Sequence, residues 1–306
     1  MSERPRYVAG CSFGKDSLAT VLIAIEHGEP LDEAIYCEVM FNDEISGEVP
    51  EHRDFIYNIA IPKLEKMGVK TNVIRDERTY VSSFTRVIKR GKRIGQINSY
   101  PICGRCCIQR DCKLPPIKKW KASLAGEVVQ YIGLAADEQE RLMKDEVRGM
   151  VSLLDKYGIT EADTFEICKR HELLSPIYEF TDRNGCWFCP NAKRKELRHL
   201  YDHHTDLWAK MLELERLPNK ATELFNREER FSDIDFLFRM ESDREQSKKT
   251  LDFLACRGDM GIQAEAKRLG VRKDTLFRWL ERQGREMIPG QLSLLDDGFI
   301  SEGASP

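Results

Sequence analysis

Apolar residues follow two different spacings along the first 190 residues. Residues 6–12 form a short apolar run typical of a buried strand, and residues 15–27 place apolar side chains at helical intervals. A helix is indicated at 50–68, with Pro near its start and Gly at its end. Further strands are predicted at 34–41, 69–74 and 128–138. Because strands alternate with helices, we expect an α/β fold with a doubly wound, Rossmann-like parallel sheet.

The strand pattern ends near residue 190, and helical spacing continues from there. We therefore expect a nucleotide-binding domain over 1–190, a helical extension over 191–257 and a flexible tail over 288–306. Between them, at 258–287, two short amphipathic helices broken at "LGVRK" resemble a helix-turn-helix, with 273–283 as the candidate recognition helix. An ordinary helical hairpin would give the same pattern.

Composition and charge indicate the cellular compartment of the protein but say little about its function. The chain has 306 residues, 41% of them hydrophobic, and a formal net charge of −3. No apolar run approaches the roughly 18 residues of a membrane span, and the N-terminus lacks the apolar region of a signal peptide. We therefore expect a cytoplasmic protein whose ten cysteines are reduced thiols or metal ligands.

The stretch "SFGKDS", residues 12–17, lies where the first strand meets the first helix. A helix N-terminus offers free backbone N–H groups and a positive dipole end to an anion. Ser12 and Ser17 add hydroxyl groups, Gly14 allows close approach of the backbone, and Lys15 supplies charge. The stretch is not a Walker loop, since only one Gly precedes the Lys. It predicts a phosphate site of another kind.

These residues resemble the PP-loop, S-G-G-x-D-S, of the adenine-nucleotide α-hydrolase superfamily, with Phe13 in place of the first Gly. That family splits ATP between its α and β phosphates. The resemblance implies catalytic roles for Lys15 and Asp16 and a Mg²⁺ ion on the phosphates, with Asp43 as a candidate ligand. It implies nucleotide binding by Ser12, Phe13, Gly14, Lys15, Asp16 and Ser17.

Within the superfamily, residues 5–190 resemble the phosphoadenosine phosphosulfate (PAPS) reductase branch, close to the ATPases of DNA phosphorothioation. "GLAADEQER" matches that branch's G-[IV]-R-x-x-E-S-x-x-R at Gly133, Glu138 and Arg141, but has Ala135 where the family often has Arg. The resemblance implies nucleotide binding by Gly133 and catalytic roles for Glu138 and Arg141. The segment 160–178, ending "LLSPIY", and Lys113 with Pro116 also resemble the branch.

Six cysteines fall in two clusters, "CGRCCIQRDC" and "GCWFCPN". A Cys-x-x-Cys turn supplies two thiolates to one metal, and a second cluster completes four ligands. Because relatives carry a [4Fe–4S] cluster, we favour iron–sulfur, with zinc as the alternative. The predicted ligands are Cys106, Cys112, Cys186 and Cys189, with Cys103 or Cys107 as alternatives to Cys112.

A local excess of positive charge suggests what kind of molecule the protein acts on. Residues 86–121 hold eleven basic residues and one acid, Asp111, which predicts contact with a polyanion. A solvated basic face is the alternative. The eleven are Arg86, Lys89, Arg90, Lys92, Arg93, Arg105, Arg110, Lys113, Lys118, Lys119 and Lys121.

Three functions fit the sequence. The first is an ATP pyrophosphatase that adenylates DNA or tRNA for sulfur transfer, with a cysteine-desulfurase-type sulfur donor. The second is a PAPS or adenylyl-sulfate reductase, although the chain has no cysteine after Cys256 to act as that family's C-terminal nucleophile. The third is a nucleotide-sensing regulator that binds nucleic acid.

Overall fold

The computed structural model describes residues 4–101, 106–144 and 149–283, and places no side chains at 258–260. The chain forms two compact units. The first, called the sheet unit here, contains Met1–His199 and Asn219–Thr222. The second, called the helical unit, contains Leu200–Pro218 and the chain from Glu223 onward. The four predicted domain boundaries stay predictions.

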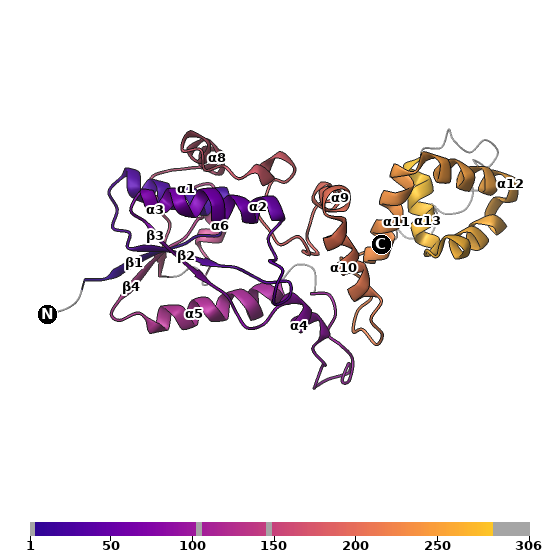
Figure 1. Ribbon diagram of the computed structural model, residues 1–306, viewed down its shortest axis with the longest axis horizontal. Helices are drawn as coiled ribbons and strands as arrows, with labels where there is room; N and C mark the ends of the chain where they lie inside the picture. Colours follow the sequence, from indigo (N-terminus) through magenta and orange to yellow (C-terminus); the bar gives the residue numbers. More distant parts are fainter. Residues whose placement is uncertain (1–3, 102–105, 145–148, 284–306) are drawn as a thin grey trace, which may run out of the picture. The chain divides into compact units, whose positions relative to one another are not determined.

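The sheet unit is built on five parallel strands, which confirms the predicted α/β class (Figure 1). The strand order is β3-β2-β1-β4-β5, and Ala9 of β1 pairs with Ala34 of β2 and Tyr131 of β4. The short β5 was not predicted, because two residues carry no periodicity. The strands are β1 (Arg6–Gly10), β2 (Glu33–Cys37), β3 (Lys70–Ile74), β4 (Val128–Tyr131) and β5 (Met150–Val151).

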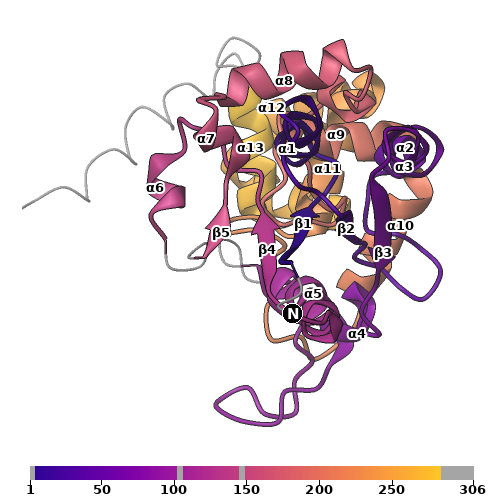
Figure 2. The same cartoon turned by 90° about the vertical axis from the view of Figure 1, so that its left-hand side faces the viewer.

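Helices lie on both faces of this sheet. Figures 1 and 2 show α1, α3 and α8 on one face and α5 on the other. The helix expected at 50–68 contains a π-helical turn, Ile56–Ala60, between α2 and α3, and a second π turn, Gln109–Lys113, precedes α5. The helices of the unit are α1 (Lys15–Glu26), α2 (Pro50–Phe55), α3 (Ile61–Lys66), α4 (Tyr80–Thr85), α5 (Leu114–Ser123), α6 (Gln139–Leu142), α7 (Leu153–Lys156), α8 (Glu161–Arg170) and a 3₁₀ turn, Pro176–Glu179.

The strand order places a topological switch point between β1 and β4. After β1 the chain moves to β2 and β3, and it then returns to the opposite side of β1 as β4. Open parallel sheets bind ligands at the carboxyl ends of the strands beside such a point. Residues 12–17 follow β1 and Gly133 follows β4, so the fold brings both resemblance segments to this position.

The helical unit contains α10 (Thr205–Glu215), α11 (Phe231–Ser242), α12 (Arg244–Leu269) and α13 (Lys273–Arg282), and α9 (Arg194–His203) leads into it. Its core includes Leu237, Leu276 and Trp279. The predicted break at "LGVRK" is confirmed, since Gly270 ends α12 in the left-handed conformation (φ 69°). The preceding helix was expected to be short, but it has 26 residues. The predicted tail from 288 lies outside the described residues.

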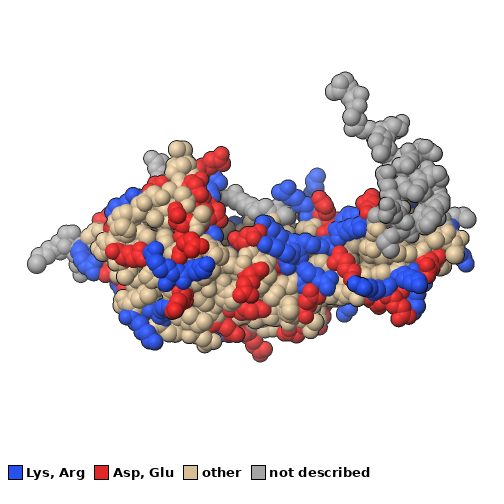
Figure 3. All heavy atoms as spheres, turned by 90° about the horizontal axis from the view of Figure 1, so that it is seen from above, with Lys and Arg blue, Asp and Glu red and all other residues tan. Residues whose placement is uncertain are grey.

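Within the described residues, none of the helices has both the length and the apolar stretch that crossing a bilayer demands. On the face drawn in Figure 3, basic and acidic side chains are intermixed. This mixing agrees with the small net charge and gives that face no single sign.

Candidate functional site

The loop between β1 and α1 is closed by its own side chains. The Ser12 backbone N–H donates to Ser17 Oγ (3.1 Å), and Ser17 Oγ donates to the Gly14 carbonyl (3.0 Å). Gly14 is the N-cap of α1 and provides no side-chain cap. The first turn of α1 therefore points N–H groups toward the loop, as an anion site requires.

Phe13 adopts a backbone conformation that normally requires glycine. Its φ is 59°, and its side chain is completely buried, edge-on to Tyr36 with ring centroids 5.2 Å apart. A bulky residue with positive φ is strained, and such strain concentrates at functional loops. Phe13 thus has a glycine-like backbone at the position where the resembled motif has Gly, and its ring packs into the core.

Lys15 is held in place by two acids. Its Nζ donates to Asp16 Oδ1 (2.7 Å) and to Glu161 Oε1 (2.8 Å), at the start of α8. Burial opposes the charge, but these hydrogen bonds raise the pKa of Lys15 above its ordinary value. Thr164 Oγ1 also donates to Asp16 Oδ1 (2.8 Å). Lys15 is therefore a fixed cation at the head of the loop.

Gly133 packs directly against the backbone of the loop. A Cβ at Gly133 would lie 2.8 Å from the backbone of Asp16 and Ser17, closer than real Cβ contacts allow. Only glycine fits there without moving the loop. The expected role of Gly133 was nucleotide binding, and what the structure shows is packing against the N-terminus of α1.

Glu138 and Arg141 pair with each other beyond Gly133. Arg141 donates to Glu138, whose other carboxylate oxygen accepts from the Ala135 N–H (3.1 Å). Asp137 Oδ1 accepts from the Glu161 N–H (3.0 Å), which joins this segment to the acid that holds Lys15. Arg141 is exposed and lies at the edge of the loop region. Asp43, the candidate Mg²⁺ ligand, is also exposed.

Three residues that the sequence reasoning did not select hold the loop from the other side. The Lys15 N–H donates to the Tyr178 hydroxyl (2.8 Å), and Asn184 Nδ2 donates to the Ser12 carbonyl (2.8 Å). His52 Nε2 lies 3.4 Å from the same carbonyl, and its Nδ1 lies 2.8 Å from Ser175 Oγ. Burial lowers the pKa of His52 to about 4. The only sequence signal was the "LLSPIY" resemblance, which contains Tyr178.

Four cysteines are close enough to the buried Tyr80 on α4 to act on its charge. Burial raises the pKa of Tyr80 well above its ordinary value, and the nearby cysteines at 107, 189, 106 and 186 raise it further. The ring stacks on Phe188, inside the Cys-x-x-Cys turn, with centroids 4.1 Å apart. Among the described residues, the Tyr80 hydroxyl is buried without a hydrogen-bond partner.

Cys112 lies in a different environment from those four. Its Sγ is 3.6 Å from Ser83 Oγ, and Cys37 Sγ donates to its carbonyl oxygen (3.8 Å). Cys103 lies outside the described residues. Of the alternatives for the fourth ligand, Cys107 therefore shares the surroundings of Cys106, Cys186 and Cys189.

These thiols are of the type that binds metals, although among the described residues no three of the cysteine sulfurs lie within 4.8 Å of one another. Burial raises the pKa of Cys186 well above its ordinary value, and the neighbouring Glu48 and Cys189 raise it further. A bound cation would reverse this by stabilising thiolates. The orphaned Tyr80 hydroxyl could then donate to a metal-bound sulfur. Burial opposes the charge of Arg183, but a hydrogen bond to Cys189 raises the pKa of its guanidinium above the ordinary value.

One segment joins the thiols to the loop. Residues 178–189 contain Tyr178 and Asn184, which bond to the loop, and Cys186 and Cys189. The Cys turn is fixed in place because Trp187 Nε1 donates to the Ser46 carbonyl (2.9 Å). One continuous stretch of chain thus bonds to the loop at 12–17 and also carries Cys186 and Cys189.

The arginines at positions 272, 278 and 282, in and next to the candidate recognition helix α13, form ion pairs with acids. Arg272 pairs with Asp233, Arg278 with Glu229 (3.6 Å) and Arg282 with Glu241 (3.6 Å). These acids belong to the helical unit itself. Arginine side chains engaged in such pairs are less available to nucleic acid.

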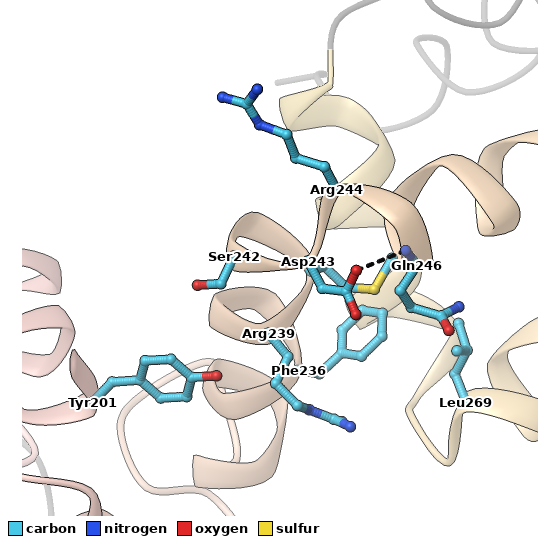
Figure 4. Close-up of a pocket in the computed structure, with 9 residues that line it drawn as sticks. Tyr201, Phe236, Arg239, Ser242, Asp243, Arg244, Gln246 and Leu269 are labelled. Atoms are coloured by element: carbon cyan, nitrogen blue, oxygen red, sulfur yellow. Dashed lines mark hydrogen bonds between the residues drawn. The ribbon is translucent and has the colours of Figure 1, made fainter.

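The helical unit also contains a cavity of about 630 Å³, lined by residues of α11 and α12 (Figure 4). Asp243 turns toward Gln246 and accepts its backbone N–H (2.9 Å), and Arg239 pairs with Asp235 (3.2 Å). These polar groups stabilise the helices, so we assign the cavity no ligand.

The comparisons with known proteins gave one distant structural likeness. No family model matches the chain, and no curated protein matches it. The structure is similar to the U34-tRNA thiolase NcsA from Methanococcus maripaludis with its [4Fe-4S] cluster, at 15% identity and a TM-score of 0.36, covering 70% of this chain and 72% of that one. We draw nothing about function from a likeness this distant.

Proposed function

We propose that this protein is an ATP pyrophosphatase that adenylates an oxygen of a nucleic-acid acceptor, so that sulfur can replace the adenylate. The observation that carries the proposal is the segment 178–189, which bonds to a phosphate-type loop and also bears Cys186 and Cys189. It unites an anion site and a thiol centre at the carboxyl ends of the strands, where this fold class binds ligands.

The loop would bind ATP as its Mg²⁺ complex. The N–H groups of Asp16 and Ser17 and the hydroxyl of Ser12 would contact the phosphates, because the Lys15 N–H already donates to Tyr178 and the Ser17 hydroxyl donates to the Gly14 carbonyl. The acceptor oxygen attacks the α-phosphorus, the bond from that phosphorus to the bridging oxygen breaks, and pyrophosphate leaves with the electron pair. Lys15, held by Asp16 and Glu161, would stabilise the charge that develops on pyrophosphate.

The thiol centre would hold a [4Fe–4S] cluster. We propose Cys106, Cys186 and Cys189 as ligands, and Cys107 ahead of Cys112 as the fourth, because Cys107 lies by the same tyrosine as the other three. When bound, such a cluster supplies sulfur-ligated iron whose reduction potential depends on its surroundings. Zinc on the same thiolates is the alternative.

The experiment measures iron, zinc and pyrophosphate in protein purified without oxygen. We expect about four irons per chain, as one cubane requires. Pyrophosphate release from ATP should need a nucleic-acid acceptor, and Lys15→Ala should slow it by about 100-fold, as loss of a charge-stabilising group does. Cys186→Ser should lose the iron and keep ATP binding, whereas the control Cys256→Ser, on α12, should keep both.

Other results would contradict the proposal. Sulfite release from PAPS or adenylyl sulfate with a thiol donor would make the protein a reductase. ATP binding with no pyrophosphate release on any acceptor would favour a nucleotide-sensing regulator. One zinc per chain and no iron would leave a structural metal site.

A further inference from the structure

A short hairpin, residues 87–97, follows α4 in the sheet unit, and we call it the finger. Val87 pairs with Ile97 in an antiparallel bridge, and two backbone hydrogen bonds, from Ile88 N–H to Gln96 (2.8 Å) and from Gly95 N–H to Ile88 (2.9 Å), close it. At the turn, Gly91 and Gly95 have φ of 86° and 83°, conformations that glycine adopts without strain. The finger therefore has a defined fold.

The base of the finger is fixed to a distant part of the chain. The Ile97 N–H donates to Asn219 (3.0 Å), and the Ala221 N–H donates to Ile97 (2.9 Å). Asn219 Nδ2 also donates to the Gly95 carbonyl (2.9 Å). Because its base is held in place, the finger loses little conformational entropy when its tip binds a partner.

The tip carries charge that nothing in the described chain neutralises. Lys89, Arg90, Lys92 and Arg93 are all exposed, and within the described residues none of them has an acidic partner. The one acid of the basic stretch, Asp111, is already paired with Arg86 (3.8 Å) and Arg110 (2.6 Å). Four unpaired cations on one turn repel each other and favour a polyanion.

An apolar residue stands among these cations. The side chain of Ile94 is 66% exposed and that of Val87 is 51% exposed. Phosphates alone give an isoleucine nothing to contact, whereas the thymine methyl groups and base edges inside a groove do. Charge and apolar surface together therefore indicate a nucleic acid read within a groove.

We infer that the finger inserts into the major groove of duplex DNA, which specifies the acceptor class on which the proposed function rests. From Val87 to Gly91 four residues span at most about 13 Å. The B-form major groove is about 12 Å wide and about 8.5 Å deep and admits a two-stranded ribbon. The major groove of A-form RNA is too narrow and deep for side chains to read.

The test is binding of labelled duplexes to the full chain without ATP, measured by fluorescence anisotropy over a range of salt. In a variant with Lys89, Arg90, Lys92 and Arg93 changed to Gln, DNA affinity at 0.1 M salt should fall at least about 100-fold. The slope of log K against log salt should flatten by about 3 to 4, at about 0.9 per lost phosphate contact. The matched control changes four other exposed lysines to Gln and should alter neither value: Lys66, Lys70, Lys144 and Lys169.

A second variant tests the apolar contact alone. Ile94→Ala should weaken DNA binding by about 5-fold with an unchanged salt slope, since no phosphate contact is lost. Equal thermal melting of both variants and the parent protein shows that they fold.

Three outcomes would overturn the inference. The first is an equal loss of DNA affinity in the finger variant and in the control. The second is tighter binding to an RNA duplex than to a DNA duplex of the same sequence. The third is binding to anionic vesicles in place of DNA. Finger-dependent DNA binding without pyrophosphate release would refute the proposed function and leave the finger intact. Pyrophosphate release that the acceptor stimulates equally in the parent protein and the finger variant would support the proposed function and refute the role of the finger.

Discussion

The loop at 12–17 and the finger at 87–97 both carry lysine in the sheet unit, but they are built in opposite ways. Lys15 is buried and bonded to two carboxylates, whereas the lysines of the finger are exposed and, among the described residues, have no acidic partner. Gly133 and the side chains of Tyr178 and Asn184 contact the backbone of the loop and confine it. The finger is held at Ile97 and Gly95 by residues 219–221, and its four cations at 89–93 have no such contacts among the described residues.

This difference fits two kinds of phosphate recognition. A reacting phosphate must be held to within a fraction of an ångström, so its site is rigid and its cation is fixed beforehand. A nucleic-acid backbone is a repeated charge, so exposed and adjustable cations suffice to bind it. The comparison predicts that changes beneath the loop act on chemistry and that changes in surface charge act on affinity.

The largest effect should follow from adding one methyl group beneath the loop. Gly133→Ala places a Cβ about 2.8 Å from the backbone of Asp16 and Ser17, so the loop must move. Because small displacements of a reacting group are costly, we expect pyrophosphate release to fall at least about 100-fold. Gly10→Ala is the control, since its Cβ would meet Gln130 Nε2 at 3.4 Å and the Tyr131 carbonyl oxygen at 3.8 Å, both ordinary contacts. Equal turnover in both variants would mean that the loop is not the reaction site.

A smaller effect should come from acid. The pKa of His52 is about 4 in the folded protein, below the value near 6.5 of an exposed histidine. The unfolded chain therefore takes up the proton first, and stability is lost as pH falls from about 6.5 toward 4. Between pH 7 and pH 5 the loss should be about 2 kcal/mol in urea unfolding.

Two histidine variants separate this contribution from others. His52→Gln should remove this part of the pH dependence, whereas His27→Gln, at an exposed position, should retain it. A pH dependence that persists unchanged in His52→Gln would assign the effect elsewhere. Protonation of His52 should act on the loop directly, because His52 Nε2 lies 3.4 Å from the Ser12 carbonyl oxygen.

The smallest effect is expected in α13. Changing Arg278 and Arg282 to Gln should alter DNA affinity by less than about 2-fold, because both guanidinium groups already pair with acids of the helical unit. The same anisotropy assay measures this. A loss of tenfold or more would place α13 on the nucleic acid and remove the contrast with the finger.

The local part of this architecture is predictable from sequence. Residues 6–27 show a strand, a small polar turn and a helix in register, and the structure has β1, the loop and α1 there. The parallel sheet followed from the alternation of elements. Local periodicity and turn chemistry fix these features, so one sequence suffices to find them.

The residues that complete the site are not predictable in this way. Tyr178 and Asn184 meet the loop from more than 160 positions away, and no local pattern records such a contact. The finger has too few alternating apolar residues to predict a hairpin, and its anchor lies at 219–222. The length of α12 was missed because the prediction confined this helix to 258–287, whereas α12 already begins at Arg244.

The position of Asn219–Thr222 has a consequence for how the protein can be divided. These four residues belong to the sheet unit, although the chain on either side of them belongs to the helical unit. The polypeptide therefore passes from one unit to the other three times. A chain cut after His199 would keep all five strands and lose the partner of Ile97 and Ser99. Truncation after His199, where the first long segment of the sheet unit ends, would thus release the base of the finger.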